Sequence, residues 1–234
     1  MKVTFKIHRF DPESGKAPFY QDFNLEIAKG MTVLEALGEI KDHQDGTLVF
    51  RKSCRSGICG SCAMKINGLN MLACETQVEK LKKTTIVVDP LPGFKPIKDL
   101  AVDLEPFYEK LHRILPYLIN PEPPPTDKER LQSPEDFKKI ELATSCILCA
   151  ACTSSCPSFW ADKTYLGPAA ILKAFRYSCD TRDAGFAQRL QTLDNKHGLW
   201  RCHTIMNCND ACPKHIFPTV GISSMKRKVV ENKF

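Results

Sequence analysis

Eleven of the twelve cysteines in this chain of 234 residues fall into three tight groups, and only Cys179 stands apart. The groups span residues 54–74, 146–156 and 202–212. Random placement would not gather thiols in this way. In a reducing compartment, clustered cysteines hold metal more often than they form disulfides. We therefore expect a chain that folds around metal centres.

The remaining composition is that of an ordinary globular protein. It is 43% hydrophobic and 26% charged, which argues against a disordered or fibrous chain. No stretch approaches the ~18 uninterrupted apolar residues that a membrane-spanning helix needs. The first residues show no basic segment followed by an apolar one, so no signal or transit peptide is visible. We expect a soluble intracellular chain that reaches a membrane only through partners.

The first cysteine group has the spacing of plant-type ferredoxins. Its C-x4-C-x2-C motif and one later cysteine are formed by Cys54, Cys59, Cys62 and Cys74. This spacing brings four thiolates to a [2Fe-2S] cluster. Gly57 and Gly60 let the loop wrap closely around such a cluster, because they carry no Cβ. The alternative is a four-cysteine zinc site, which usually shows two separate C-x2-4-C pairs, so the spacing favours the cluster.

The second and third groups read as a pair of bacterial ferredoxin motifs. The second group consists of Cys146, Cys149, Cys152 and Cys156, followed by Pro157, and the third of Cys202, Cys208 and Cys212. In such motifs the first three cysteines hold one cluster and the fourth ligates the other cluster of the pair. Exchanging the fourth ligands assigns Cys146, Cys149, Cys152 and Cys212 to a [4Fe-4S] cluster. The last cluster then has Cys156, Cys202 and Cys208.

One residue of the third group determines the type of the last cluster. Ile205 stands where a thiolate belongs, and an aliphatic side chain cannot ligate iron. A cubane cluster that lacks one protein ligand can lose the corresponding iron, so we predict a [3Fe-4S] cluster. A [4Fe-4S] cluster with an open, exchangeable iron is the alternative.

The formal net charge of +6 does not indicate a nucleic-acid partner. Each oxidised cluster with its thiolates carries roughly −2, so three clusters bring the loaded chain close to neutrality. If the clusters cancel the net positive charge of the chain, the protein has little electrostatic attraction for a nucleic acid. We therefore expect no nucleic-acid binding.

The pattern of apolar residues predicts two domains, residues 1–100 and residues 101–234. In the first, alternation predicts strands at 2–7 and 22–27, and a capping box at Thr32 and Glu35 starts a helix. Further short strands are expected at 47–50, 63–66 and 85–88, around a glycine-rich loop at 53–61. The second domain is helical, with helices expected at 104–115, from Pro134, and at 168–178, 187–193 and 219–230. A proline-rich spacer covers 121–125.

Motifs for organic cofactors and for hydrolysis are absent from the sequence. It contains no G-x-G-x-x-G, phosphate-binding G-x4-G-K-[ST], G-x-S-x-G or H-E-x-x-H motif. The chain can pass single electrons, but it has no evident group that splits a two-electron donor. A two-electron substrate must therefore react on another subunit.

Four segments resemble the iron–sulfur subunit of succinate dehydrogenase and fumarate reductase. They are residues 53–62 (SCRSGICGSC), 146–149 (CILC), 155–160 (SCPSFW) and 201–208 (RCHTIMNC). The likeness extends over essentially the whole chain. It implies an α+β protein, with an N-terminal β-grasp [2Fe-2S] ferredoxin domain and a C-terminal all-α domain like a bacterial ferredoxin.

The resemblance also implies partners and a direction of flow. An FAD-containing flavoprotein subunit is expected beside the [2Fe-2S] cluster. A membrane anchor of one or more subunits, with or without haem, is expected with a quinone beside the [3Fe-4S] cluster. Electrons would pass from FAD through the three clusters to quinone as succinate becomes fumarate. The chain would have no dicarboxylate site and would lie at the cytoplasmic face of a bacterial inner membrane.

The same resemblance assigns five residues to the quinone site. They are Pro157, Ser158, Trp160, His203 and Ile205. Without the family, Trp160 reads as a packed or interface aromatic and His203 as a capped surface histidine. Many relatives carry a second tryptophan after the first, and this chain has Ala161 there, which leaves the quinone type and pose open.

Other functions are open to a chain of this kind. A quinol:fumarate reductase uses the same relay in reverse, although the residues around His203 and Trp160 look more like those of dehydrogenases. A soluble polyferredoxin shuttle is a rival from another class, but shuttles tend to be small and acidic. A zinc-stabilised interaction protein would be colourless. Cys179 matches no ligand position and is expected to be a buried structural thiol.

Overall fold

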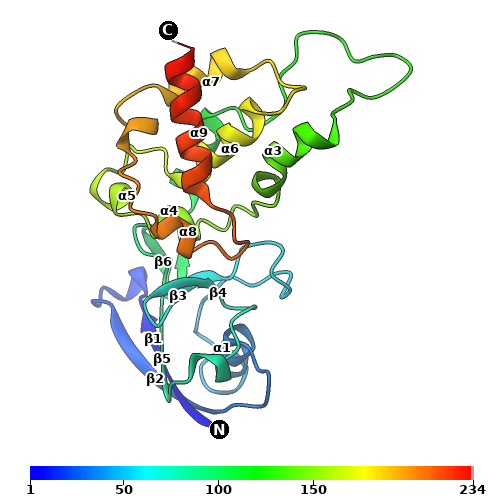
Figure 1. The fold of residues 1–234 in the computed structure, drawn as a ribbon. Coiled ribbons are helices and arrows are strands. Elements are labelled where there is room, and N and C mark those ends of the chain that lie inside the picture. The colour runs from blue at the N-terminus through cyan, green and yellow to red at the C-terminus, as the bar shows by residue number, and fades with distance from the viewer. Residues whose placement is uncertain (233–234) are drawn as a thin grey trace. The chain divides into compact units, whose positions relative to one another are not determined.

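The computed structural model describes residues 1–232 of the chain. They form two compact units, which Figure 1 traces in sequence colours. The first unit contains residues 1–104 together with residues 147–155, and the second contains residues 105–146 and the residues from 156 onward. The segment 147–155, which carries Cys149 and Cys152, therefore packs with the first unit and interrupts the second.

The first unit is a mixed five-stranded sheet packed against one helix. Its strands are β1 (Lys2–Arg9), β2 (Phe19–Glu26), β3 (Ala63–Ile66), β4 (Leu69–Leu72) and β5 (Thr85–Asp89), in the order β2-β1-β5-β3-β4. Strand β1 is antiparallel to β2 and parallel to β5, and β3 is antiparallel to both of its neighbours. Short 3-10 turns cover Pro12–Ser14 and Glu79–Leu81, and a hairpin joins β6 (Pro96–Lys98) to β7 (Ala101–Val102).

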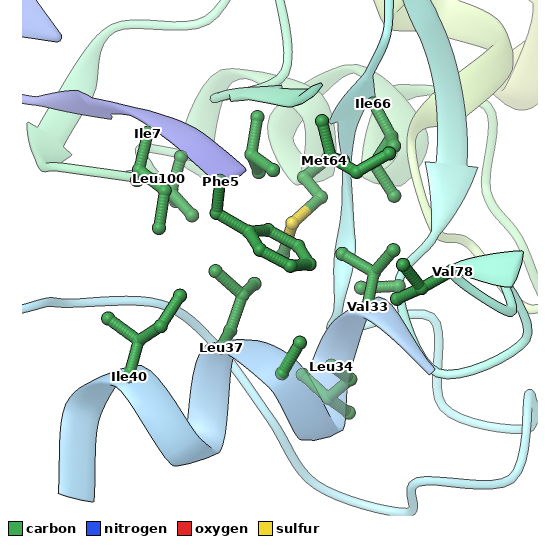
Figure 2. Packing of buried hydrophobic residues seen from close by; sticks show 14 of the residues in the cluster. Phe5, Ile7, Val33, Leu34, Leu37, Ile40, Met64, Ile66, Val78 and Leu100 are labelled. Atoms are coloured by element: carbon green, nitrogen blue, oxygen red, sulfur yellow. The ribbon is translucent and has the colours of Figure 1, made fainter. Parts of the chain in front are cut away.

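Helix α1 (Val33–His43) covers the apolar face of this sheet. Thr32 and Glu35 form the predicted capping box, in which the Thr32 hydroxyl accepts the Glu35 N–H at 3.2 Å and the Glu35 carboxylate accepts the Thr32 N–H at 2.8 Å. Figure 2 shows Phe5 of β1 pointing toward Leu37 of α1, beside Met64 of β3. All three side chains are fully buried or nearly so. Burying residues of this size contributes roughly 1.5–3 kcal/mol each, so this contact holds the helix to the sheet.

One strand predicted for the first unit is wrong, and one strand was missed. Residues 47–50 are turn and coil, not a strand, because other groups take their backbone hydrogen bonds: the Asp99 carboxylate accepts the Val49 N–H at 2.8 Å and the Leu48 carbonyl accepts a hydrogen bond from Lys41. Strand β4 was not predicted. It follows a two-residue turn, Asn67–Gly68, in which both residues have positive φ. An Asn-Gly pair between apolar runs is a strong hairpin signal, so the sequence did contain it.

The second unit is helical, which with the sheet of the first confirms the predicted α+β class. Its helices are α2 (Glu105–Arg113), α3 (Pro134–Thr144), α5 (Pro157–Ala161), α6 (Pro168–Ser178), α7 (Phe186–Leu193), α8 (Asn207–Asp210) and α9 (Pro218–Glu231), with a 3-10 turn at Leu199–Arg201. Helix α4 (Ala151–Ser154) belongs to the first unit. Helix α6 packs against α9, α3, α2 and α7 and is the centre of the second unit. The predicted start of α3 and the predicted bounds of α6, α7 and α9 are confirmed to within one residue.

Helix α2 is shorter than the helix predicted for 104–115. It ends at Arg113, and Leu115 has a left-handed backbone with φ of 50°. The following Pro116 disfavours a helical conformation at Leu115. The buried guanidinium of Arg189 donates to the carbonyls of Ile114, Leu115 and Tyr117 and pairs with Asp183, both side chains being inaccessible to solvent. This buried pair fixes the chain that leaves α2.

Candidate metal centres

The loop of the first cysteine group points its backbone N–H groups at sulfur. The Sγ atom of Cys54 accepts the N–H groups of Ile58 and Cys59, each at 3.3 Å, and that of Ser56 at 3.5 Å. The Sγ atom of Cys74, which follows β4, accepts the Gly57 N–H at 3.3 Å. Hydrogen bonds of this kind stabilise thiolate rather than thiol. The loop is therefore shaped to hold negative sulfur.

The thiols of this group differ in pKa, and therefore in how readily they ionise. The backbone N–H groups of Ser56 and Cys59, with the Cys59 side chain, lower the pKa of the Cys54 thiol to about 6. The Ser61 hydroxyl, 3.1 Å from Cys59 Sγ, lowers the pKa of that thiol too. Burial instead raises the pKa of the Cys62 thiol to about 12. A buried thiolate at Cys62 needs a neighbouring cation, and the irons of a [2Fe-2S] cluster would supply one. This mixture of hydrogen-bonded and buried sulfurs fits the predicted cluster.

Glycine is required at two places in the loop. Gly57 and Gly60 have φ of 69° and 73°. A Cβ on Gly57 would stand 2.0 Å from the Glu75 carboxylate, and a Cβ on Gly60 would stand 2.7 Å from Cys149 Cβ. Both glycines therefore serve the close wrapping predicted from the sequence. The contact with Cys149 was not predicted, since residue 149 is far away in the chain.

The cysteines predicted for the [4Fe-4S] cluster are divided between the two units. Cys146 and Cys212 pack against the same buried residues of the second unit, namely Ala143, Leu172 and Ile216. Cys149 and Cys152 belong to the segment 147–155 of the first unit, where Cys149 packs on the hydrophobic core. The shared packing of Cys146 and Cys212 agrees with the exchange of ligands between motifs. The set of four remains a prediction.

The third set of thiols surrounds a hollow in the second unit. Cys156, Cys202 and Cys208 line a hollow that opens to solvent, together with Ile205 and the buried Tyr165. Burial raises the pKa of the Cys208 thiol to about 12, and the nearby Cys156 and Cys202 thiolates add to this rise. The three sulfurs therefore lie close enough to repel one another when ionised. A multi-iron centre would remove that repulsion.

Ile205 occupies a backbone frame that elsewhere carries a cysteine. Thr204 and Met206 on either side of Ile205 have φ of 57° and 72°, as Leu148 and Ala150 on either side of Cys149 have φ of 55° and 64°. In both runs a short helix, α4 or α8, follows. Left-handed backbone is unfavourable for a β-branched residue such as Thr204. The loop keeps this conformation with isoleucine in the ligand position.

Hydrogen-bond donors also reach the sulfur of Cys156. Burial is the largest effect and raises the pKa of the Cys156 thiol. The N–H groups of Phe159 and Ser158 and the Ser158 hydroxyl oppose this effect by donating to its sulfur. For a single ion the geometry is different: among residues 1–232, no three His, Cys, Asp or Glu side chains are placed to hold one.

The residues predicted for the quinone site differ in their exposure and in whether they line the hollow. Pro157, Ser158, His203 and Ile205 all line the hollow with the three cysteines. Ser158 is buried and directs its hydroxyl at Cys156, whereas His203 and Ile205 are exposed. Trp160, on α5, is 47% exposed. Ser158 is therefore placed to act on sulfur, and the exposed residues are the ones accessible to a second molecule.

Sequence reasoning missed two residues near the third set. Tyr165 is fully buried against the cysteines, and Lys226 of α9 donates to the Cys202 carbonyl at 2.9 Å. Neither belongs to a cysteine motif, so no spacing rule could find them. Cys179 is half-buried at the end of α6, and burial raises the pKa of its thiol, in line with a structural role.

Two family models match the chain. Residues 4–109 match a 2Fe-2S iron-sulfur cluster binding domain, and residues 142–216 match a 4Fe-4S dicluster domain. The succinate dehydrogenase iron-sulfur subunit of Paracoccus denitrificans is 45% identical over 229 residues, which cover 97% of this chain and 88% of the relative. The chain belongs to the family of succinate dehydrogenase iron–sulfur subunits. The predicted family is thereby confirmed, and this chain is the electron-relaying subunit of an oxidoreductase complex.

Other relatives agree with this assignment. The mitochondrial succinate dehydrogenase [ubiquinone] iron-sulfur subunit of Candida glabrata is 44% identical over 97% of this chain and 90% of its own length. The subunit of Coxiella burnetii is 43% identical over 98% and 97%, respectively. Among solved structures, a chain of the Mycobacterium smegmatis Sdh1 complex in the apo form superimposes with a TM-score of 0.86 at 25% identity, covering 99% of this chain and 97% of that one. In residues 1–232, no helix combines the length and the apolar character needed to cross a bilayer.

Proposed function

We propose that this subunit carries electrons from the FAD of a flavoprotein partner through [2Fe-2S], [4Fe-4S] and [3Fe-4S] clusters to a membrane quinone. The observation that carries the proposal is the hollow lined by Cys156, Cys202 and Cys208, with Ile205 in the fourth ligand position. A centre with three thiolates and one vacant corner suits a three-iron cluster. Clusters of this kind exchange one electron at a time, which is what a chain of relay centres needs.

The proposed ligands follow the three cysteine groups. Cys54, Cys59, Cys62 and Cys74 hold the first cluster, Cys146, Cys149, Cys152 and Cys212 the second, and Cys156, Cys202 and Cys208 the third. The amide-lined loop around Cys54 and the shared packing of Cys146 with Cys212 support this division. The oxidation of succinate itself belongs to the flavoprotein partner, because this sequence has no motif for a nucleotide or flavin.

The quinone end of the relay lies, on this proposal, beside the third cluster. His203 follows the ligand Cys202 directly, and its side chain is exposed at the rim of the hollow. A histidine can supply or relay a proton near neutral pH, which quinone reduction requires. Trp160 is tethered four residues beyond Cys156 and can offer its indole N–H to a quinone carbonyl. Exposed Ile205 and Met206 add apolar surface for the quinone ring or the anchor.

The family supports a direction of flow and a location at a membrane. The relatives are named for succinate dehydrogenase, which favours oxidation of succinate over the reverse reaction with fumarate. We place the subunit at the cytoplasmic face of a bacterial inner membrane, held there by its anchor subunits. A soluble shuttle would leave washed membranes with mild salt, whereas a subunit of this complex would stay.

The test is metal analysis and spectroscopy of the complex purified from membranes. The proposed ligands imply about nine irons for each copy of this chain. The oxidised complex should give the electron paramagnetic resonance signal of a three-iron cluster, and dithionite should add the signal of a reduced [2Fe-2S] cluster. Stoichiometric zinc, or an oxidised complex without the three-iron signal, would contradict the proposal.

A further inference from the structure

Tyr165 presents an unsatisfied hydroxyl to the third cysteine group. The side chain is completely buried and lines the hollow formed by Cys156, Cys202 and Cys208. Within residues 1–232 its hydroxyl oxygen has no hydrogen-bond partner of normal geometry. A buried hydroxyl without a partner is rare, because it loses its bonds to water and gains nothing in return. We therefore expect the Tyr165 hydroxyl to have a hydrogen-bond acceptor inside the hollow.

The acceptors beside this hydroxyl are sulfur atoms. Cys156, Cys202 and Cys208 line the same hollow as Tyr165, and Cys202 is within reach of the Tyr165 hydroxyl. A tyrosine hydroxyl keeps its proton near neutral pH, so it can donate a hydrogen bond to one of these sulfurs. Three negative sulfurs and one buried donor form a complementary set.

The segment around Tyr165 is held on both sides. The Tyr165 N–H donates to the Asp162 carbonyl at 3.2 Å, and the Leu166 N–H donates to the His197 carbonyl at 3.0 Å. The Asp162 carboxylate also lies 2.8 Å from His197 Nδ1. These bonds fix the backbone at Tyr165 and join it to the segment around His197. The side chain is preorganised toward the sulfurs.

We propose that Tyr165 donates a hydrogen bond to the Sγ atom of Cys202 and thereby raises the reduction potential of the cluster bound there. The proposal rests on the three-iron cluster of the proposed function. In the step concerned, one electron from the preceding cluster enters this centre and later leaves for quinone. No bond breaks, and the tyrosine proton stays on its oxygen.

The sign of the effect follows from charge. Reduction adds one negative charge, which spreads over the sulfur atoms. A hydrogen bond to sulfur is stronger when that sulfur is more negative, so it stabilises the reduced state more than the oxidised one. Tyr165 is thus a tuning residue that makes the last relay centre a better electron acceptor. The Ser158 hydroxyl on Cys156 acts in the same sense on a second sulfur.

The test compares Tyr165→Phe with the unmodified complex purified from membranes. A redox titration followed by the three-iron resonance should show an about tenfold smaller equilibrium constant for reduction, which is about 59 mV for a one-electron couple. Tyr117→Phe removes a hydroxyl from a side chain that is 55% exposed and should leave the potential unchanged. A Tyr165→Phe complex with a normal three-iron signal and an unchanged potential would overturn the proposal.

A second measurement detects the hydrogen bond itself. Electron–nuclear double resonance in deuterated buffer should find an exchangeable proton coupled to the three-iron cluster, and Tyr165→Phe should remove that coupling. Its persistence in the variant would contradict the assignment to Tyr165. Site-specific fluorinated tyrosine at residue 165, a stronger donor of the same shape, should shift the potential upward, and it decides the matter if the phenylalanine variant loses its cluster. Absence of the three-iron signal from the unmodified complex would instead contradict the proposed function.

Discussion

Gly60 lies so close to Cys149 that a Cβ on Gly60 would stand 2.7 Å from the Cβ and 2.9 Å from the Cα of Cys149. Gly60 belongs to the loop of the first cysteine group and Cys149 to the second group, and both are part of the first unit. The backbone around one proposed cluster therefore touches a proposed ligand of the next. Such contact is what a relay between neighbouring centres requires.

We predict that Gly60→Ala disturbs both clusters. The backbone there has φ of 73°, which costs an alanine about 1–2 kcal/mol, and the new methyl group must push Cys149 away. Gly30→Ala is the matched control, since Gly30 has φ of 80° but no atom within 4 Å of its added Cβ. Thermal unfolding should show a loss for both variants. Only Gly60→Ala should slow reduction of the second cluster by succinate, and equal rates in both variants would argue against the contact.

We predict that Ile205→Cys converts the third cluster to [4Fe-4S]. The left-handed residues on either side of Ile205 repeat the frame around Cys149, so a thiol at 205 is already aimed as a ligand. The oxidised complex should lose its three-iron resonance and gain about one iron. Ile205→Ala offers no ligand and should keep the three-iron signal. A three-iron signal that persists in the cysteine variant would show that the loop does not place residue 205 as a ligand.

Replacing Trp160 by Phe or His203 by Ala tests the quinone end. Quinone-linked succinate oxidation should fall by about an order of magnitude or more, as expected on loss of a group that orients or protonates the substrate. Dye-linked oxidation and the cluster spectra should stay nearly normal. Trp200→Phe is the control, because Trp200 is similarly exposed and is not assigned to the quinone site. A parallel fall of both activities would instead indicate damage to the relay or to assembly.

Arg189→Met should strongly destabilise the second unit. It leaves Asp183 buried without its partner and strips the carbonyls of Leu115 and Tyr117 of a donor. Breaking a buried pair in this way typically costs about 3–5 kcal/mol. Lys139→Ala breaks an exposed ion pair with Asp136 and should cost far less, because water screens this pair. Thermal unfolding of the two complexes measures the difference, and comparable losses would show that the Arg189 pair is not a major support.

Local rules explain why so much of the fold could be predicted. The start of α1 follows from the capping box at Thr32, and the start of α3 from Ser133 followed by Pro134. The alternation of Val3, Phe5 and Ile7 gave β1 its buried face. The failure at residues 47–50 has the opposite cause. The Val49 N–H donates to the Asp99 carboxylate, fifty residues away, and no local pattern reports such a partner.

Cysteine spacing and the isoleucine at 205 are enough to predict the chemistry of the centres, because they state how many thiolates each loop can offer. Which distant groups surround those thiolates depends on the tertiary structure. It brought Gly60 against Cys149 and placed Tyr165 and Ser158 beside Cys202 and Cys156. Short motifs of a few residues supply the cluster ligands. Close approach, burial and donated hydrogen bonds instead arise from packing between segments far apart in the chain. The identity of the clusters can therefore be predicted from the sequence, and the tuning of their potentials only from the folded protein.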